Sequence, residues 1–268
     1  MKTQPAWLRQ LLRNSLRIAA LLLLCTVALQ IVFIVRIAFM TVLDPQSTTF
    51  QRSEAWRLLV DKQQIAWAQD WVASDRIAVN LKRAVIASED AGFVDHGGVD
   101  WAAVEKAWGR NQKAAERVER QVTRQVTRQV DHKTAKATSP QKPVLAKVVG
   151  GSTITQQLAK NLFLSGERTV LRKAQELVLT LTLEALLSKE RILEIYLNNV
   201  EWGEGVFGAQ AAARHYFHVD SAKLGPEQAA RLAVMLPAPK RFEQRPGSAY
   251  VVGRAATIQA RMGGVALP

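Results

Sequence analysis

A long run of apolar residues near the start of the chain predicts the first element. Residues 18–35 are 18 consecutive positions without a charge, and only Thr26 and Gln30 among them are clearly polar. As a helix, this stretch is about 27 Å long, close to the thickness of a bilayer core. The residues before it carry basic side chains and no acid. By the positive-inside rule, this pattern predicts a cytoplasmic basic flank at 1–17, a transmembrane anchor at 18–43, and the rest of the chain across the membrane.

A cleaved signal peptide is the main alternative, because it also joins a basic start to an apolar core. Such cores usually span roughly 7–15 residues and end at a small-x-small site. Here the core is longer, and Arg36 with the residues after it offers no clear cleavage site. Cys25 would suit a lipoprotein, but Leu24 before it is not small. A buried helix of a soluble protein is disfavoured by the basic flank, so we predict a retained anchor.

The remaining pattern predicts a mainly α-helical domain. After a polar linker at 41–52, apolar residues recur at helical spacing in most of the chain, and strand signals are scarce. Glycines at 203–208 predict a loop between two of the helical stretches. The predicted helical segments are 53–98, 101–112, 150–164, 169–199 (as one or two helices), 209–217 and 226–236.

Composition and charge narrow the class of protein. The 268 residues suit one compact domain with an anchor, and 48% hydrophobic with 22% charged residues excludes wholesale disorder. A single cysteine excludes an intramolecular disulfide framework and a cysteine-based zinc site. The net charge of +13 indicates a polyanionic partner. Nucleic acid, an anionic membrane surface and a phosphate-bearing substrate are all compatible with it.

Much of this charge lies in one segment at 105–149. It contains eleven Lys and Arg residues against four Asp and Glu residues, an excess of seven. It also contains a short Q-V-T-R repeat, whose valines at 122, 126 and 130 fit a weak helical stripe. The simpler interpretation is a solvated, partly disordered insertion. The alternative is a basic arm that lies on anionic lipid headgroups.

Two adjacent carboxylates, Glu89 and Asp90, follow an apolar stretch at 84–87. Neighbours on a helix point about 100° apart, so one carboxylate can face a cleft while the other supports it. A glutamate beside apolar residues has its pKa raised by desolvation, which suits a general base. A surface acidic pair at a helix end is an equal alternative on this segment alone.

A second motif begins at Gly150 and reads G-G-S-T-I-T-Q-Q-L-A-K-N. Glycines followed by Ser152 and Thr153 form a good helix start, where exposed backbone N–H groups bind anions. Gln157 and Lys160 continue a polar stripe with a cation, and Ile154 begins an apolar stripe on another face. An ordinary capped helix is the alternative, but the combination favours a phosphate site.

Two further motifs are charged helical segments. R-K-x-x-E at 172–176 and K-x-R-I-L-E-x-Y-L-N at 189–198 are, taken alone, typical of salt-bridged or amphipathic surface helices. The pattern G-x-G-x-x-G at 203–208 fits a dinucleotide fingerprint, but no strand is predicted before it, so that interpretation fails.

The four motifs together, in this order and after an N-terminal anchor, resemble the glycosyltransferase family 51 domain of peptidoglycan synthases. More narrowly, the chain resembles the monofunctional biosynthetic peptidoglycan transglycosylases of Gram-negative type. The blocks are E-D-x-x-F-x-x-H-x-G from Glu89, the glycine-led block from Gly150, and the segments 172–176 and 189–198. The resemblance covers roughly residues 53–245, apart from the basic insert, which is longer than the resemblance leads us to expect.

This resemblance implies a lysozyme-like glycosyltransferase domain at 44–250, with the basic insert at about 105–149 and a C-terminal tail at 251–268. It implies polymerisation of lipid II into β-1,4-linked glycan strands, with inversion and release of undecaprenyl diphosphate. It also implies a single-pass protein of the inner membrane whose catalytic domain is periplasmic. Lipid II, the nascent glycan strand and the membrane are the expected partners. Penicillin-binding and division proteins are candidate partners, and nucleic acid is not expected.

The same resemblance implies roles for individual residues. Glu89 is the expected base, and Glu176 the second catalytic carboxylate, near the diphosphate or a divalent cation. No cofactor is firmly implied; Mg²⁺ or Mn²⁺ is compatible with the chemistry, but the sequence shows no ligand set. A lytic transglycosylase or lysozyme-like muramidase and an inactive membrane-tethered scaffold are the alternatives. The residues expected to bind diphosphate or sugar are Asp90, His96, Ser152, Thr153, Gln156, Gln157, Lys160, Asn161, Arg172, Lys173, Arg191, Tyr196 and Asn198.

Overall fold

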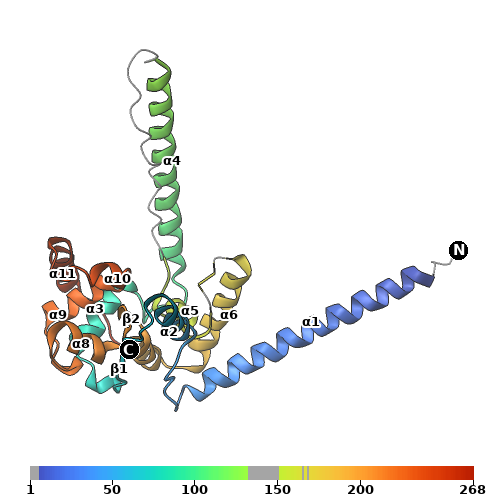
Figure 1. Cartoon of the computed structure of the whole chain (residues 1–268), viewed down its shortest axis with the longest axis horizontal. Helices are drawn as coiled ribbons and strands as arrows, with labels where there is room; N and C mark the ends of the chain where they lie inside the picture. The colour runs from blue at the N-terminus through green and yellow to red at the C-terminus, as the bar shows by residue number, and fades with distance from the viewer. Residues whose placement is uncertain (1–5, 132–150, 165, 168) are drawn as a thin grey trace.

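The computed structural model describes residues 6–131, 151–164, 166–167 and 169–268. Two long helices, α1 and α4, project from a helical body (Figure 1). The helices are α1 (Ala6–Phe39), α2 (Thr49–Lys62), α3 (Val79–Glu89), α4 (Trp101–Asp131), α5 (Ile154–Phe163), α6 (Val170–Leu186), α7 (Lys189–Asn199), α8 (Ala209–Phe217), α9 (Pro226–Met235), α10 (Pro239–Phe242) and α11 (Ala249–Met262), with 3-10 turns η1 (Ser74–Arg76) and η2 (Ser221–Lys223).

The described residues form one small sheet beside the helices. Its strands are β1 (Ala68–Gln69), β2 (Glu201–Gly203) and β3 (Val206–Phe207), in the order β1-β3-β2. β1 is parallel to β3, and β2 is antiparallel to β3 with an irregular register. The glycine stretch that the sequence predicted as a loop therefore closes a tight hairpin. At Gly205, φ is +73° and an added Cβ would clash with the Ala66 carbonyl oxygen, so this position requires glycine.

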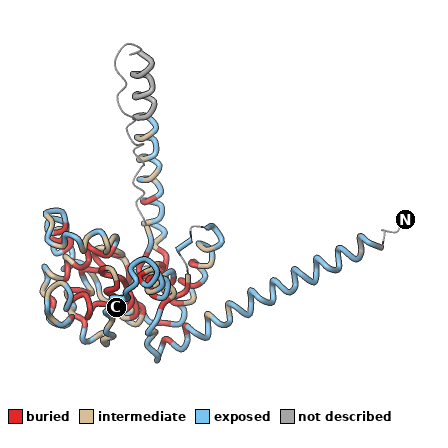
Figure 2. The backbone as a smooth tube through the Cα atoms, in the orientation of Figure 1, coloured by how far each residue is buried: buried red, intermediate tan, exposed pale blue. Residues whose placement is uncertain are grey.

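The core lies inside the body, where helices far apart in the sequence pack together (Figure 2). Helices α3, α9 and α11 pack against one another, and Leu81, Val85 and Ile86 of α3 are fully buried. On the other side, α5 packs against α6 and α7. The side chains of Leu158 on α5 and Leu183 on α6 are buried there. The mainly α-helical expectation is confirmed.

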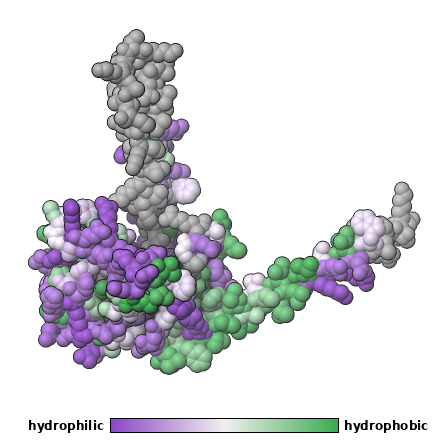
Figure 3. Space-filling view, in the orientation of Figure 1, coloured by the Kyte–Doolittle hydropathy of each residue, from purple (hydrophilic) through white to green (hydrophobic). Residues whose placement is uncertain are grey.

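One helix of the described chain, spanning Gln10–Phe39, is long and apolar enough to cross a membrane. Its most apolar window is entirely unburied, unlike a helix of a soluble core, and Figure 3 shows the hydrophobic surface along it. The end of α1 nevertheless belongs to the body, because Ile37 and Met40 are buried. Gln30 and Gln175 of α6 also exchange hydrogen bonds of 2.9 and 3.2 Å. These contacts support a retained helix.

Three segments differ from the sequence-based expectations. The helix predicted over 53–98 is broken: Thr48 caps α2 with a capping box, and Gln63 ends it in a left-handed conformation. The helix expected over 101–112 continues to Asp131, because no glycine or proline interrupts 110–131. The rest of the insert, 132–149, lies outside the described residues. Residues 251–262 of the expected tail at 251–268 lie in α11, whose apolar face is buried.

Candidate active site

The N-terminus of α5 is assembled around Asp90, the residue that directly follows α3. The Asp90 carboxylate accepts a 3.0 Å hydrogen bond from the Ile154 backbone N–H and lies 2.9 Å from the His96 ring nitrogen Nε2. His96 in turn accepts a 3.2 Å hydrogen bond from the Gly98 N–H. Asp90 is buried, and its negative charge interacts favourably with the positive end of the α5 dipole. Asp90 and His96 therefore hold the second motif against the first.

Thr153 makes the cap that the sequence predicted. Its hydroxyl accepts a 3.1 Å hydrogen bond from the Gln156 N–H and donates one of 2.6 Å to the Gly98 carbonyl. The Gln156 side chain returns to the Thr153 N–H at 3.2 Å, completing a capping box. The start of α5 is thus rigidly tied to the loop that follows Glu89.

Glu89, the last residue of α3, points differently from Asp90, as helix geometry predicted. Its carboxylate accepts hydrogen bonds from the Gln157 side chain at 3.0 Å and from Ser88 at 3.3 Å. The Tyr196 hydroxyl donates to the other end of the Gln157 amide at 2.9 Å. This bond orients the amide so that its NH₂ group faces Glu89.

Burial raises the pKa of Glu89, and the nearby Asp90 charge raises it further. The hydrogen bonds from Gln157 and Ser88 act in the opposite direction, but burial is the largest effect. A carboxylate with a raised pKa and one stabilising amide is suited to accepting a proton.

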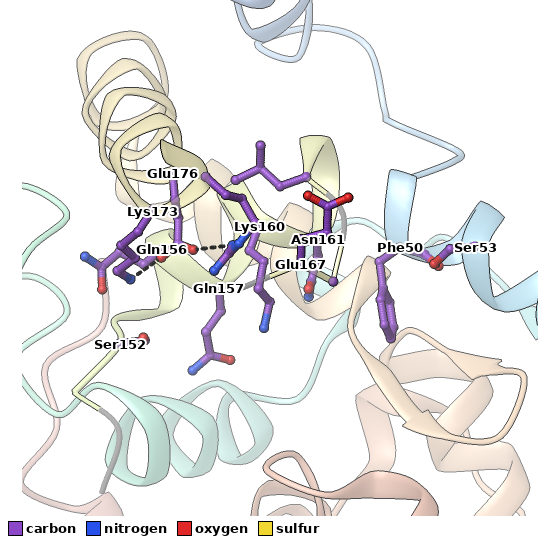
Figure 4. A pocket seen from close by; sticks show the side chains of 13 residues that line it. Phe50, Ser53, Ser152, Gln156, Gln157, Lys160, Asn161, Glu167, Lys173 and Glu176 are labelled. Carbon is purple, nitrogen blue, oxygen red and sulfur yellow. Dashed lines mark hydrogen bonds and ion pairs between the residues drawn. The ribbon is translucent and has the colours of Figure 1, made fainter. Parts of the chain in front are cut away.

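Gln157 also lines a cavity of about 370 Å³ between α2, α5 and α6. Figure 4 shows Phe50 and Ser53 entering it from α2, across from Lys173 and Glu176 of α6. Glu89 is therefore one side chain away from the cavity. The lining residues are Phe50, Ser53, Ser152, Gln156, Gln157, Lys160, Asn161, Leu164, Gly166, Glu167, Arg172, Lys173 and Glu176.

The cavity wall carries a cluster of charges. Buried Glu176 pairs with Arg172 at 2.9 Å and with Lys173. Among the described residues Lys160 has no ion-pair partner, and Arg172 Nε is buried without a hydrogen-bond acceptor. Desolvation lowers the pKa of Lys160; Glu176 opposes this shift, and the charges of Arg172 and Lys173 add to it. Lys160 therefore leaves a cation of the cavity wall available to an anion.

Eight predicted site residues line the cavity: Ser152, Gln156, Gln157, Lys160, Asn161, Arg172, Lys173 and Glu176. Glu89, Asp90, His96 and Thr153 belong to the framework described above and do not line it, and neither do Arg191, Tyr196 and Asn198. Arg191 does not line the cavity: it binds Asp44 and Glu194 at 2.7 Å each, and the Met40 carbonyl oxygen at 2.8 Å. It therefore fastens the end of α1 to α7.

Tyr196 and Asn198 likewise do not line the cavity. Both are fully buried. Tyr196 supports Gln157 from behind. Asn198 makes two 2.9 Å hydrogen bonds with the Val72 backbone, fixing the segment before α3. These are supporting positions, because neither side chain faces the cavity.

Sequence reasoning missed the α2 wall, which Phe50 and Ser53 supply. The T-x-x-Q pattern from Thr48 to Gln51 is a capping-box signal that could have located the start of α2. It could not have shown that α2 faces the second motif, since that contact joins residues more than a hundred positions apart.

No preformed site for a divalent cation is found among the described residues. They contain no group of three His, Cys, Asp or Glu side chains that could hold a metal. Glu176 has both carboxylate oxygens engaged by Arg172 and Lys173.

Comparison with known proteins gives consistent matches. The family described as "Transglycosylase" matches residues 59–148 and 132–263. A biosynthetic peptidoglycan transglycosylase of Paraburkholderia phytofirmans is 45% identical over 251 residues, which cover 94% of this chain and 92% of that protein. Proteins of the same name from Burkholderia ambifaria and Burkholderia multivorans are 47% identical over 241 residues, covering 90% of this chain and 86% of each. The chain belongs to the transglycosylase family.

Proposed function

We propose that this chain is a peptidoglycan glycosyltransferase that polymerises lipid II into β-1,4-linked glycan strands. Family membership supports the reaction class. The observation that carries the proposal is the pairing of two features: Glu89, with a raised pKa, is held by Gln157, and the same Gln157 lines a cavity with the cations Lys160, Arg172 and Lys173.

In the proposed step, the 4-hydroxyl oxygen of the acceptor sugar attacks the anomeric carbon of the donor. The hydroxyl proton passes to the Glu89 carboxylate as the new C–O bond forms. The bond from the anomeric carbon to the diphosphate oxygen breaks, and undecaprenyl diphosphate leaves. Attack opposite the leaving group inverts an α-linked donor and gives the β-1,4 bond. Because the burial of Glu89 raises its pKa, the carboxylate is a stronger base than an exposed glutamate.

The leaving diphosphate needs charge stabilisation more than a proton, because it is already a weak base. Lys160 has no ion-pair partner in the described chain, and Arg172 has a spare buried N–H group. Glu176 holds Arg172 and Lys173 in place by ion pairing, so its proposed role is to organise this cluster. Ser152, Gln156 and Asn161 complete the polar wall that would contact diphosphate or sugar.

The lipid substrate fits a membrane-anchored protein. The candidate span at Gln10–Phe39 anchors the domain. Basic residues before the span and the positive-inside rule support a cytoplasmic N-terminus, a periplasmic domain and an inner-membrane location. The lipid II headgroup and the growing strand would then meet the cavity on the same side. Penicillin-binding and division proteins are proposed protein partners.

The test is to supply the purified full chain in detergent with labelled lipid II, and separately with finished peptidoglycan. We expect long glycan from lipid II and no degradation of the finished polymer. Degradation of finished peptidoglycan with lipid II left intact would replace the proposal with a lytic activity. Turnover of neither would indicate a scaffold.

A further inference from the structure

Two buried carboxylates and a partly exposed lysine, 38% exposed at its side chain, lie behind the α2 wall, outside the cavity. Glu54 of α2 and Glu201 of β2 are both buried, and Lys240 of α10 lies between them. The Lys240 ammonium donates to the Glu54 carboxylate at 2.5 Å and lies 3.6 Å from a Glu201 oxygen. One ammonium thus joins three elements that are distant in the sequence.

This cluster is coupled to the cavity through α2. Glu54 directly follows Ser53 and is one helical turn after Phe50, the two α2 residues that line the cavity. Side chains four positions apart lie on neighbouring parts of a helix surface. A contact that holds Glu54 in place therefore also sets the rotation of α2 and the position of Phe50 and Ser53 at the cavity.

Further ion pairs tie the second half of α2 to the β2–β3 hairpin. Arg57 binds Glu204 at 2.6 Å and also pairs with Glu54, while Lys62 binds Glu204 at 2.9 Å. The Glu204 N–H donates to Glu243, just after α10, at 2.5 Å. Lys62 and Glu204 are more exposed than the Glu54–Lys240 pair, so solvent weakens their attraction.

The cluster of Glu54, Glu201 and Lys240 is poorly explained as a source of stability. Glu201 Oε1 is buried without a hydrogen bond, and burial raises the pKa of this carboxyl to about 7. Lys240 partly offsets that shift, whereas the Glu54 and Glu243 charges add to it. An ion pair on a buried carboxylate is often no more stabilising than apolar packing, and in some proteins such pairs serve to fix one geometry instead.

We propose that Lys240 is a positioning residue of the active site. Its ammonium, shared by Glu54 and Glu201, holds α2 so that Phe50 and Ser53 wall the cavity. Lys240 does not touch the cavity itself and acts through α2. The kinetic consequence rests on the proposed glycosyltransferase function, whereas the structural consequence does not.

The test uses the full chain with Lys240→Met, the conservative Lys240→Arg, and Lys62→Met as a matched control on the exposed ion pair. Lys240→Met is expected to fold, because Glu54 keeps its pairing with Arg57 and Glu201 can take a proton. Position is read by pulsed electron spin resonance between labels on cysteines replacing exposed Trp56 of α2 and Ala185 of α6, in a Cys25→Ser background.

We expect Lys240→Met to broaden or shift the label distance distribution, and Lys240→Arg and Lys62→Met to leave it as in the parent. The KM for lipid II should rise at least about threefold in Lys240→Met, with kcat within about twofold, because a binding wall is displaced. An unchanged distance distribution in Lys240→Met overturns the inference, whatever the kinetics. A changed distribution in a chain that does not polymerise lipid II supports the positioning role and refutes the proposed function instead.

Discussion

Replacing Glu201 with glutamine should stabilise the protein in a pH-dependent way. Burial raises the pKa of Glu201 from 4.5 to about 7, so the folded state holds this proton more tightly than the unfolded state. An acid with a raised folded pKa contributes stability below about pH 4.5, and this contribution is lost as the pH rises to 7. The neutral glutamine side chain carries no such dependence.

The size of this stability gain follows from how far burial raises the pKa of Glu201. About 2.5 pKa units at 1.36 kcal/mol per unit give an upper value of about 3 kcal/mol. The variant should therefore match the parent near pH 4 and exceed it by up to about 3 kcal/mol at pH 8. For a domain of this size, that corresponds to roughly 6–12 °C in unfolding temperature.

The assay is thermal unfolding of the full chain in detergent, followed by circular dichroism across this pH range. Glu116→Gln is the matched control, because this α4 carboxylate is exposed. A constant difference between Glu201→Gln and the parent at all pH values would refute the reasoning. So would an equal pH-dependent gain in the control.

Three further predictions follow from the site and the fold. Gln157→Leu removes a hydrogen bond that lowers the pKa of Glu89, so the acid limb of kcat/KM against pH should move to higher pH; an unmoved limb contradicts this assignment. Asp90→Ala leaves an α5 backbone N–H unpaired and should destabilise the protein by about 2–3 kcal/mol in denaturant unfolding. Gly205→Ala should destabilise it by at least about 2 kcal/mol in the same assay, because φ is positive and the new Cβ meets the Ala66 carbonyl.

Local patterns predicted the elements whose signals are contained within one segment. The helix Ala209–Phe217 has the predicted bounds, because Gly208 precedes it and its apolar residues recur regularly. A helix start at Ser152 and Thr153 was likewise predicted from the glycines before them, and Thr153 is the cap. In contrast, the prediction of one continuous helix over 53–98 was wrong. The left-handed residue Gln63 is neither glycine nor asparagine, so it left no breaker signal.

The sequence showed which residue types could do the chemistry, but less of how they contact one another in the fold. Helix geometry predicted that Glu89 and Asp90 would diverge, but not that Gln157, 68 positions later, would bind Glu89. Arg191 carries a cationic side chain that could bind a diphosphate, yet in the structure it fastens α1 to α7. A helical pattern shows which side chains share a face and does not show which neighbour that face meets.

The most direct test of the central claim compares the wild-type chain with Glu89→Gln on lipid II. If Glu89 is the base, glycan synthesis by Glu89→Gln falls by roughly 10²–10⁴-fold. The affinity for lipid II should stay within about twofold, because the amide retains the shape of the side chain and only the base is lost. Glycan synthesis within about tenfold of wild type would contradict the assignment of Glu89 as the base.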